Sequence, residues 1–347
     1  MFNKNLKFFR LKNALTKKEL ADKIAVTPMA ITHYESGARK PDIAVIKQLA
    51  EVLGVRVADF LAVRNENLAF IHGDFRKNST LTISQQEYVR ECVEEYFNRF
   101  MTIVEILGGE VLPEAPETNK LPLAEDNEVN AQALRRHLGL AAEGPIGSIV
   151  ELLENKGILV YMCTVENDKF SGMNGFINGR PYIVINETMS PERNRSTIVH
   201  ELAHLMFVWP RDMEDKQVEA TATAIGGAFL LPGTDAFREL GIRRSRWSSD
   251  MLLVAKEYGI SMFLLMKRAG LLHIVSENVE TSFYMWASSR GWRKDEPSRM
   301  EPETAVLFEQ LIVRAVNEGE ISLQKAAELL KVTYDEMGSR CSLLEAL

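Results

Sequence analysis

The sequence predicts a multi-domain fold that is mainly α-helical with one small β-sheet. The length of 347 residues suits two or three domains. Apolar residues mostly recur at helical spacing, in amphipathic segments that end at turn-forming residues. Two segments, 158–165 and 182–186, instead have the length and the β-branched composition of short strands. Helices should therefore dominate, with a sheet in the middle of the chain.

The elements are expected in a simple order along the chain. A compact helical domain occupies residues 1–64, with four helices between Leu15 and Phe60, and a polar linker follows at 65–84. A second domain covers 85–275, and a helical C-terminal region covers 276–347. The two strands flank a hairpin within 170–180. Helices are expected at about 84–107, 128–138, 145–156, 191–207, 215–229 and 248–270, with two or three more within 302–345.

Composition argues against a membrane protein and favours a reducing compartment. No run of about 18 apolar residues is present, and the first ten residues lack the apolar core of a secretory signal. The three cysteines are far apart, so they make neither a disulfide framework nor a CxxC metal pair. We therefore expect a cytoplasmic protein with no membrane partner.

The net charge of −7 is distributed unevenly along the chain. Residues 1–64 contain 12 Lys or Arg and 6 Asp or Glu, a balance of +6, which leaves −13 for the remainder. A basic N-terminal domain on an acidic body indicates that only the N-terminal domain meets a polyanion. An ordinary solvated surface is the alternative interpretation of the same charges.

The N-terminal domain contains two capped helices joined by a short turn. Thr16 can cap a helix that begins at Lys17, with Glu19 at the capping-box position. Thr27 can cap the next helix, with Pro28 at its first position, where a missing amide hydrogen costs nothing. Both helix starts are therefore specified locally.

The second of these helices has one inward and one outward face. Ile31 and Tyr34 lie at i, i+3 spacing and should point into the core. Met29, Thr32 and His33 then point outward near the helix N-terminus. A second helix with outward residues near its N-terminus has the geometry that enters a DNA major groove.

These segments resemble the Cro/CI-type (XRE-like) helix-turn-helix family. The resemblance rests on KKELADKIAVTPMAITHYESGARKP followed by LAEVLGV. It implies a lambda-repressor-like domain of four or five helices that binds a double-stranded DNA operator as a homodimer. The residues that it implies near DNA are Thr16, Lys17, Lys18, Thr27, Met29, Thr32, His33, Arg39 and Lys40. The outward positions lack Gln, Asn and Arg, so contacts by Thr, Met and His are expected instead. A helical bundle used for protein contacts or dimerisation is the alternative.

A second motif lies in the helix expected at 191–207. Residues 200–204 read His-Glu-Leu-Ala-His. On a 3.6-residue period His200 and His204 share one face, and two imidazoles at this spacing can bind one tetrahedral zinc ion. Zinc lowers the pKa of a water and polarises a peptide carbonyl. Glu201 could take the proton of that water and deliver it to the leaving amine.

The zinc site needs a third ligand, and the following helix offers one. Glu219 lies at the start of that helix, 15 residues after His204. Glu214 and Asp215 are nearby alternatives. The small residues at 220–228 would let the second helix pack closely against the first, which would bring Glu219 to the metal.

These segments resemble the ImmA/IrrE-type metallopeptidase family. The segments that carry the resemblance, in family order, are FSGMNGFINGRPYIVIN, RSTIVHELAHLMF and VEATATAIGGAFLLP, and it spans roughly 85–275. It implies a zincin-like α+β domain. The implied roles are zinc binding by His200, His204 and Glu219 and base catalysis by Glu201.

Two details of this resemblance carry expectations of their own. After the third ligand the family often has Glu or Gln and then Ala-Asn, whereas this chain has Thr221-Ala222-Thr223, so support for the ligands could differ. In peptidases of this type an edge strand often aligns an extended substrate by backbone pairing. We expect the strand at 182–186 to be part of the core and also such an edge.

Together the two resemblances predict a DNA-binding transcriptional regulator, expected to be a repressor, whose zinc-dependent endopeptidase domain cleaves a protein. The implied targets are a partner repressor or antitoxin, in mobile elements or stress responses, or this chain itself. The alternative is a non-catalytic DNA-binding regulator or antitoxin whose zincin domain senses a ligand or partner. A third interpretation is a peptidase that the N-terminal domain only recruits to DNA.

Overall fold

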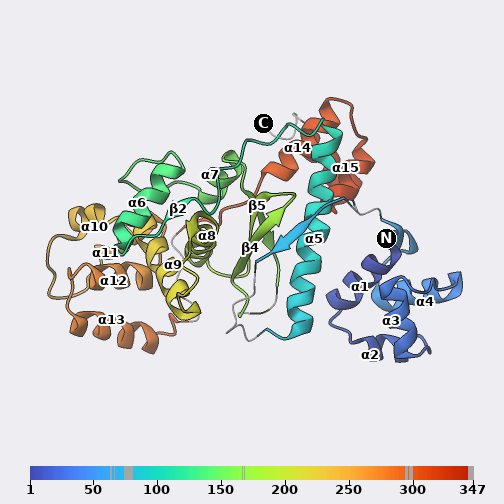
Figure 1. Ribbon diagram of the computed structural model, residues 1–347, viewed down its shortest axis with the longest axis horizontal. Coiled ribbons are helices and arrows are strands. Elements are labelled where there is room, and N and C mark those ends of the chain that lie inside the picture. Colours follow the sequence, from blue (N-terminus) through green and yellow to red (C-terminus); the bar gives the residue numbers. More distant parts are fainter. Residues whose placement is uncertain are drawn as a thin grey trace. The chain divides into compact units, whose positions relative to one another are not determined.

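The computed structural model describes residues 1–62, 65, 67–73, 81–165, 167, 169–293, 296 and 300–342. This part of the chain is mainly helical and contains a small mixed sheet, as the sequence predicts (Figure 1). It forms two compact units. The first combines the described residues of 1–68, 75–109 and 311–347, and the second combines those of 69–74 and 110–310. The predicted boundaries at 64, 84 and 275 divide the chain differently.

The first unit begins with a bundle of short helices. These are α1 (Phe2–Lys12), α2 (Lys17–Lys23), α3 (Pro28–Ser36), α4 (Ile43–Leu53) and the 3-10 helix η1 (Val57–Leu61). Thr16 and Glu19 form the predicted capping box of α2, and the Thr27 hydroxyl accepts a hydrogen bond from the Ala30 amide at the start of α3. Gly37 ends α3 in the left-handed conformation, with φ of 76°. The predicted helix starts are confirmed.

Helices from two distant parts of the sequence complete the first unit. They are α5 (Ile83–Ile106), α15 (Leu323–Leu330) and α16 (Tyr334–Cys341), and α14 (Leu307–Asn317) crosses the boundary at 310. α1 packs on α5, with Lys7 Nζ 3.3 Å from Glu91 Oε1. Lys331, between α15 and α16, places its Nζ 2.8 Å from Glu95 Oε2 of α5. These contacts explain why α5 and the C-terminal helices group with the N-terminal bundle.

The second unit contains a four-stranded sheet in the order β1-β4-β5-β3. The strands are β1 (Phe70–His72), β3 (Leu159–Cys163), β4 (Gly172–Ile177) and β5 (Arg180–Asn186). β4 lies within the stretch 170–180 where a hairpin was expected, but its hairpin partner is β5, the strand expected at 182–186. β3 pairs with β5 in parallel. A separate parallel pair joins β2 (Leu121–Pro122) to β6 (Phe207–Val208).

The sheet order corrects one expectation about the strand at 182–186. β5 contains this segment, and its residues 182–185 are fully buried, so its core role is confirmed. Its edge role is wrong, because β3 covers one side of β5 and β4 covers the other. β1 lies within the stretch read as a polar linker and was not predicted.

The rest of the second unit is mainly helical. Its helices are α6 (Asn127–His137), α7 (Ile149–Asn155), α8 (Pro191–Met206), α9 (Asp215–Leu230), α10 (Gly233–Leu240), α11 (Met251–Tyr258), α12 (Met262–Leu271) and α13 (Glu277–Ser289). α8 packs against β4, β5 and α9 (Figure 1). The segment expected to be helical at 248–270 contains two helices, α11 and α12, because Gly259 ends α11 with φ of 60°. None of the helices in the described ranges is long and apolar enough to cross a bilayer.

Candidate functional site

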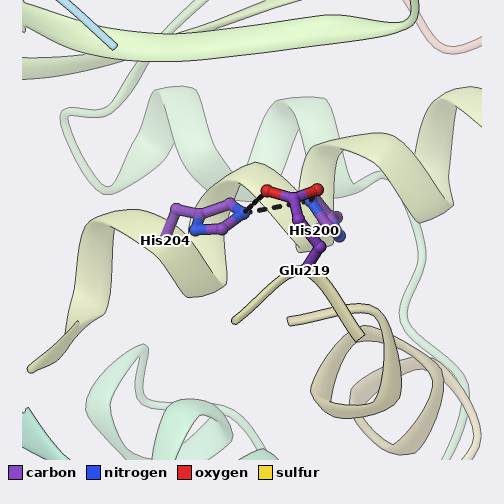
Figure 2. A group of neighbouring side chains, drawn as sticks. All are labelled: His200, His204 and Glu219. Carbon is purple, nitrogen blue, oxygen red and sulfur yellow. Dashed lines mark hydrogen bonds and ion pairs between the residues drawn. The ribbon is translucent and has the colours of Figure 1, made fainter. Parts of the chain in front are cut away.

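Helix α8 carries the predicted histidine pair on a rigid, buried element. Its start is fixed by Ser190, whose side chain accepts from the Arg193 amide, and by Pro191 at the first helical position. Most of its side chains are buried against the sheet and α9. His200 and His204 are one turn apart and therefore point in the same direction (Figure 2).

Three predicted side chains converge at this point. The Nε2 atoms of His200 and His204 are 3.0 Å apart. Glu219 of α9 places Oε2 3.4 Å from His200 Nε2 and Oε1 3.3 Å from His204 Nε2 (Figure 2). Among the residues that the structure describes, these three form a cluster of side chains that could bind one metal ion.

The donor set fits a zinc ion. Ligand atoms at the usual zinc bond lengths stand about 3.3 Å apart on the corners of a tetrahedron. The two Nε2 atoms are 3.0 Å apart, and Glu219 brings a different carboxylate oxygen near each of them. One donor atom from each of the three residues lies within 4.8 Å of the other two. Two imidazole nitrogens and one carboxylate are also ligands that zinc accepts, and three protein ligands leave a fourth position open. The side chain of Glu219 is 33% exposed, so the site is reached from solvent.

The hydrogen bonds of Thr223 indicate which nitrogen of the His200 ring carries the proton. The Thr223 hydroxyl donates to the Glu219 carbonyl oxygen at 2.8 Å, which uses its one proton. It therefore accepts the hydrogen bond that links it to His200 Nδ1, at 3.1 Å. With a proton on Nδ1, His200 presents the lone pair of Nε2 to a metal. At the position where the family often has asparagine, this chain therefore has a threonine that accepts a hydrogen bond from His200.

Glu201 lies next to the ligand group but is not part of it. Its side chain is buried, and Asn174 Nδ2 of β4 donates to its Oε2 at 2.8 Å. The hydrogen bond fixes one carboxylate oxygen and leaves the other for proton transfer. Sequence reasoning missed Asn174, whose signal is a polar side chain within an otherwise apolar strand.

Close packing of two helices delivers the third ligand. A Cβ atom on Gly226 of α9 would lie 3.7 Å from the His200 amide nitrogen and 3.7 Å from the Val199 side chain. The small residues of α9 thus lie directly on α8, as expected from the sequence. Glu214 and Asp215, the alternative ligands, lie at the start of α9 and outside the ligand group.

An aromatic side chain lies next to the ring of His204. The ring centroid of Trp209, just after β6, is 5.4 Å from that of His204. The sequence offered no reason to select this tryptophan, because its position depends on how the chain turns after α8. It limits the positions open to the His204 ring.

The predicted DNA-contacting residues lie on the surface of the N-terminal bundle. Ile31 and Tyr34 are buried, and Met29 is 61% exposed, as the two-faced helix requires. Thr32 is half-buried, and its hydroxyl donates to the Pro28 carbonyl oxygen at 3.2 Å. Lys17 is half-buried, with Nζ 3.6 Å from Glu35 Oε2. The exposed members of the predicted set are Thr16, Lys18, Thr27, Met29, His33, Arg39 and Lys40.

A buried ion pair that the sequence analysis did not identify holds α3 in place. Arg10 of α1 donates from Nη2 to Glu35 Oε2 at 3.1 Å and from Nη1 to the Leu15 carbonyl oxygen at 2.8 Å. Both side chains are almost completely buried. The pair joins the first helix to the helix whose outer face carries the predicted DNA contacts.

Comparisons with known proteins agree with both parts of this description. Residues 6–60 match the family model described as Helix-turn-helix, and residues 153–269 match the IrrE N-terminal-like domain. The second match includes the two histidines, Glu201 and Glu219. A stretch of 77 residues is 34% identical to the uncharacterized HTH-type transcriptional regulator YqaE of Bacillus subtilis (strain 168). It covers 22% of this chain and 66% of that protein.

No solved structure matches the chain significantly. The assignment therefore rests on the two family models, on the bacterial relative and on the site geometry. The chain joins a helix-turn-helix domain of the XRE type to a domain of the IrrE-like peptidase family.

Proposed function

We propose that this chain is a DNA-binding transcriptional repressor whose second domain is a zinc-dependent endopeptidase that cleaves a regulatory protein or the chain itself. The observation that carries the proposal is the convergence of His200, His204 and Glu219 beside Glu201. A purely structural histidine pair does not explain a carboxylate within 3.4 Å of both rings and a second carboxylate held by Asn174.

The residues of this chain have separate tasks in such a reaction. Zinc at this site would supply Lewis-acid chemistry that activates water and polarises a peptide carbonyl. Thr223 orients His200, and Trp209 borders His204. Glu201 takes the proton of the attacking water and then delivers it to the leaving amine nitrogen. Asn174 keeps the Glu201 carboxylate in the orientation that both transfers need.

The N-terminal domain binds an operator through α3 in this proposal. Thr27, Met29, Thr32 and His33 face base edges or phosphates from the first turns of α3, and the exposed Arg39 and Lys40 hold phosphates. The remaining members of the predicted set are Thr16, Lys17 and Lys18 at the start of α2. Two copies on paired half-sites would form the homodimer. Cys92 and Cys163 are buried and form no disulfide in the described part of the chain, which fits a reducing cytoplasm.

Glu201→Gln tests the peptidase directly. Wild type and Glu201→Gln, both loaded with zinc, are incubated with host lysate and operator-bearing DNA, and every new protein N-terminus is sequenced. New termini with wild type alone are expected, because glutamine cannot accept the water proton but keeps the side-chain shape. Those termini also name the substrate. Identical termini with both proteins would contradict the peptidase proposal.

A cavity favours the second candidate, a non-catalytic regulator that senses a small molecule. It has a volume of about 200 Å³ and lies at the N-terminal half of α8, where it is lined mainly by apolar side chains such as Met162, Met189 and Ile198. Asn194 also lines it, and its buried Oδ1 has no hydrogen-bond partner among the described residues. A sensor of this kind would generate no new N-termini, and its regulatory effect would be the same in wild type and Glu201→Gln. If wild type cleaves a protein and Glu201→Gln still represses, DNA control and proteolysis are separate activities of the chain.

A further inference from the structure

Strand β1 covers the free edge of β4 with a segment of the chain's own linker. Phe70, Ile71 and His72 pair antiparallel with Ile177, Phe176 and Gly175. The ladder continues at both ends of β1. The Asn178 amide donates to the Ala69 carbonyl oxygen at 2.9 Å, and the Gly73 amide donates to the Asn174 carbonyl oxygen at 2.8 Å.

The strand position that β1 occupies leads directly to Glu201. Asn174 accepts from the Gly73 amide through its backbone and donates to Glu201 Oε2 through its side chain, each at 2.8 Å. A Cβ atom on Gly73 would lie 2.7 Å from the Asn174 carbonyl oxygen and 3.1 Å from its Oδ1. An extended chain paired with β4 in this register therefore contacts Asn174, the residue whose side chain holds the proposed catalytic base.

We infer that β1 is an intramolecular occupant of the substrate-pairing edge, and that an extended peptide substrate must displace it to reach Glu201. This inference rests on the proposed peptidase function. The partner that fits the edge is a peptide in extended conformation, which would pair antiparallel with β4 through its main chain. Since β1 belongs to the segment between the helix-turn-helix domain and α5, the occupant of the edge is tied through the chain to the DNA-binding domain.

The strand is attached weakly enough to be exchanged. β1 has three residues, the Ile71 side chain is 66% exposed, and Phe70 and His72 are only partly buried. One of its side chains is held by the 2.7 Å hydrogen bond between His72 Nδ1 and the Tyr182 hydroxyl. Short edge strands with few buried apolar contacts open at low cost. A tethered strand of this kind competes with a free peptide at a high effective concentration.

The test removes β1 from the edge and measures peptide binding without catalysis. Ile71→Pro deletes the amide hydrogen of the central β1 residue, while Ile71→Thr keeps it at the same exposed position. Both are made in full-length Glu201→Gln, which cannot cut the probe. The probe is a fluorescent peptide with the sequence LAFIHG, residues 68–73 of this chain.

The inference predicts that the probe binds Ile71→Pro at least about tenfold more tightly than Ile71→Thr. Gly73→Ala is a second variant that changes the resident strand and not the edge of β4. Its Cβ would lie 2.7 Å from the Asn174 carbonyl oxygen, so it should loosen the resident strand and strengthen binding of the probe, which keeps its glycine. Equal binding to all variants, or no binding to any of them, would overturn the inference. If the probe binds as predicted but wild type generates no new N-termini, the peptidase proposal fails while the occupancy of the edge by β1 stands.

Discussion

A single hydroxyl group determines how His200 can act. Because Thr223 donates to the Glu219 carbonyl oxygen, it can only accept from His200, and the ring proton is therefore assigned to Nδ1. The same residue thus links the backbone of one proposed ligand to the ring of another. Partners of metal-binding histidines commonly contribute a factor of 10 to 100 in metal affinity.

Thr223→Val should weaken zinc binding by about 10- to 100-fold, because valine has nearly the same shape but cannot accept from Nδ1. Thr223→Ser keeps the hydroxyl and should bind zinc almost as wild type does. Thr221→Val is the matched control, because Thr221 lies on α9 only two residues before Thr223. Zinc affinity is measured by competition with a chromophoric chelator. Equal losses for Thr221→Val and Thr223→Val would contradict the assigned role.

The sequence predicted residues whose positions follow from one helix, and it missed residues that reach the site from elsewhere. His200, Glu201 and His204 are related by the helical period, so their arrangement follows from the sequence. Glu219 was one of three candidate acids, because packing of α9 on α8 decides between them. Asn174 lies on a strand 27 residues before Glu201, and no local pattern places it there.

At the scale of elements, a carboxyl group joins α7 to the start of α14. Glu154 Oε2 of α7 accepts from the Val306 and Leu307 amides at 3.1 and 3.2 Å. Burial raises the pKa of Glu154 to about 7, although these two hydrogen bonds favour the charged form. The folded protein therefore binds this proton more tightly than the unfolded chain does.

This elevated pKa predicts a stability loss between about pH 4.5 and 7. A raised pKa stabilises the folded state fully below the unfolded pKa of 4.5, and that stabilisation disappears as the pH rises through about 7. Glu154→Gln keeps an acceptor oxygen but does not titrate. The free energy of unfolding of wild type should fall relative to this variant by up to about 3 kcal/mol across the window.

Thermal or denaturant unfolding of both proteins at several pH values measures this difference. Titration of other groups is common to the two proteins and cancels in the comparison. Parallel pH profiles for wild type and Glu154→Gln would show that Glu154 titrates normally in the folded chain.

Elements with local signals were predicted well, and those set by distant partners were not. The caps at Thr16, Thr27 and Pro191 gave the correct helix starts. β1 was missed, because three residues in a polar stretch carry almost no strand signal and the pairing partner lies about 100 residues away in the sequence. The same sheet order made β5 an interior strand, since its neighbours could not be read from its own residues.

At the scale of the whole chain, the sequence located the two family domains but not the compact units. The helix-turn-helix match ends at residue 60, yet the first unit also contains α5, α15 and α16. Contacts such as Lys331 with Glu95 join residues more than 200 positions apart, and sequence periodicity gives no information on such pairs. The C-terminal helices α15 and α16 thus belong to the same compact unit as the N-terminal bundle and α5.

In the proposed site, α8 and α9 supply three zinc ligands, and Glu201 remains available as the catalytic base. The most direct test is the zinc affinity and stoichiometry of the full-length chain with Glu219→Ala, Glu201→Gln and the control Glu214→Ala. Glu201→Gln and Glu214→Ala should each bind one zinc with wild-type affinity. Glu219→Ala should bind zinc at least about 100-fold more weakly. Wild-type affinity in Glu219→Ala, or loss of zinc in Glu201→Gln, would contradict this arrangement.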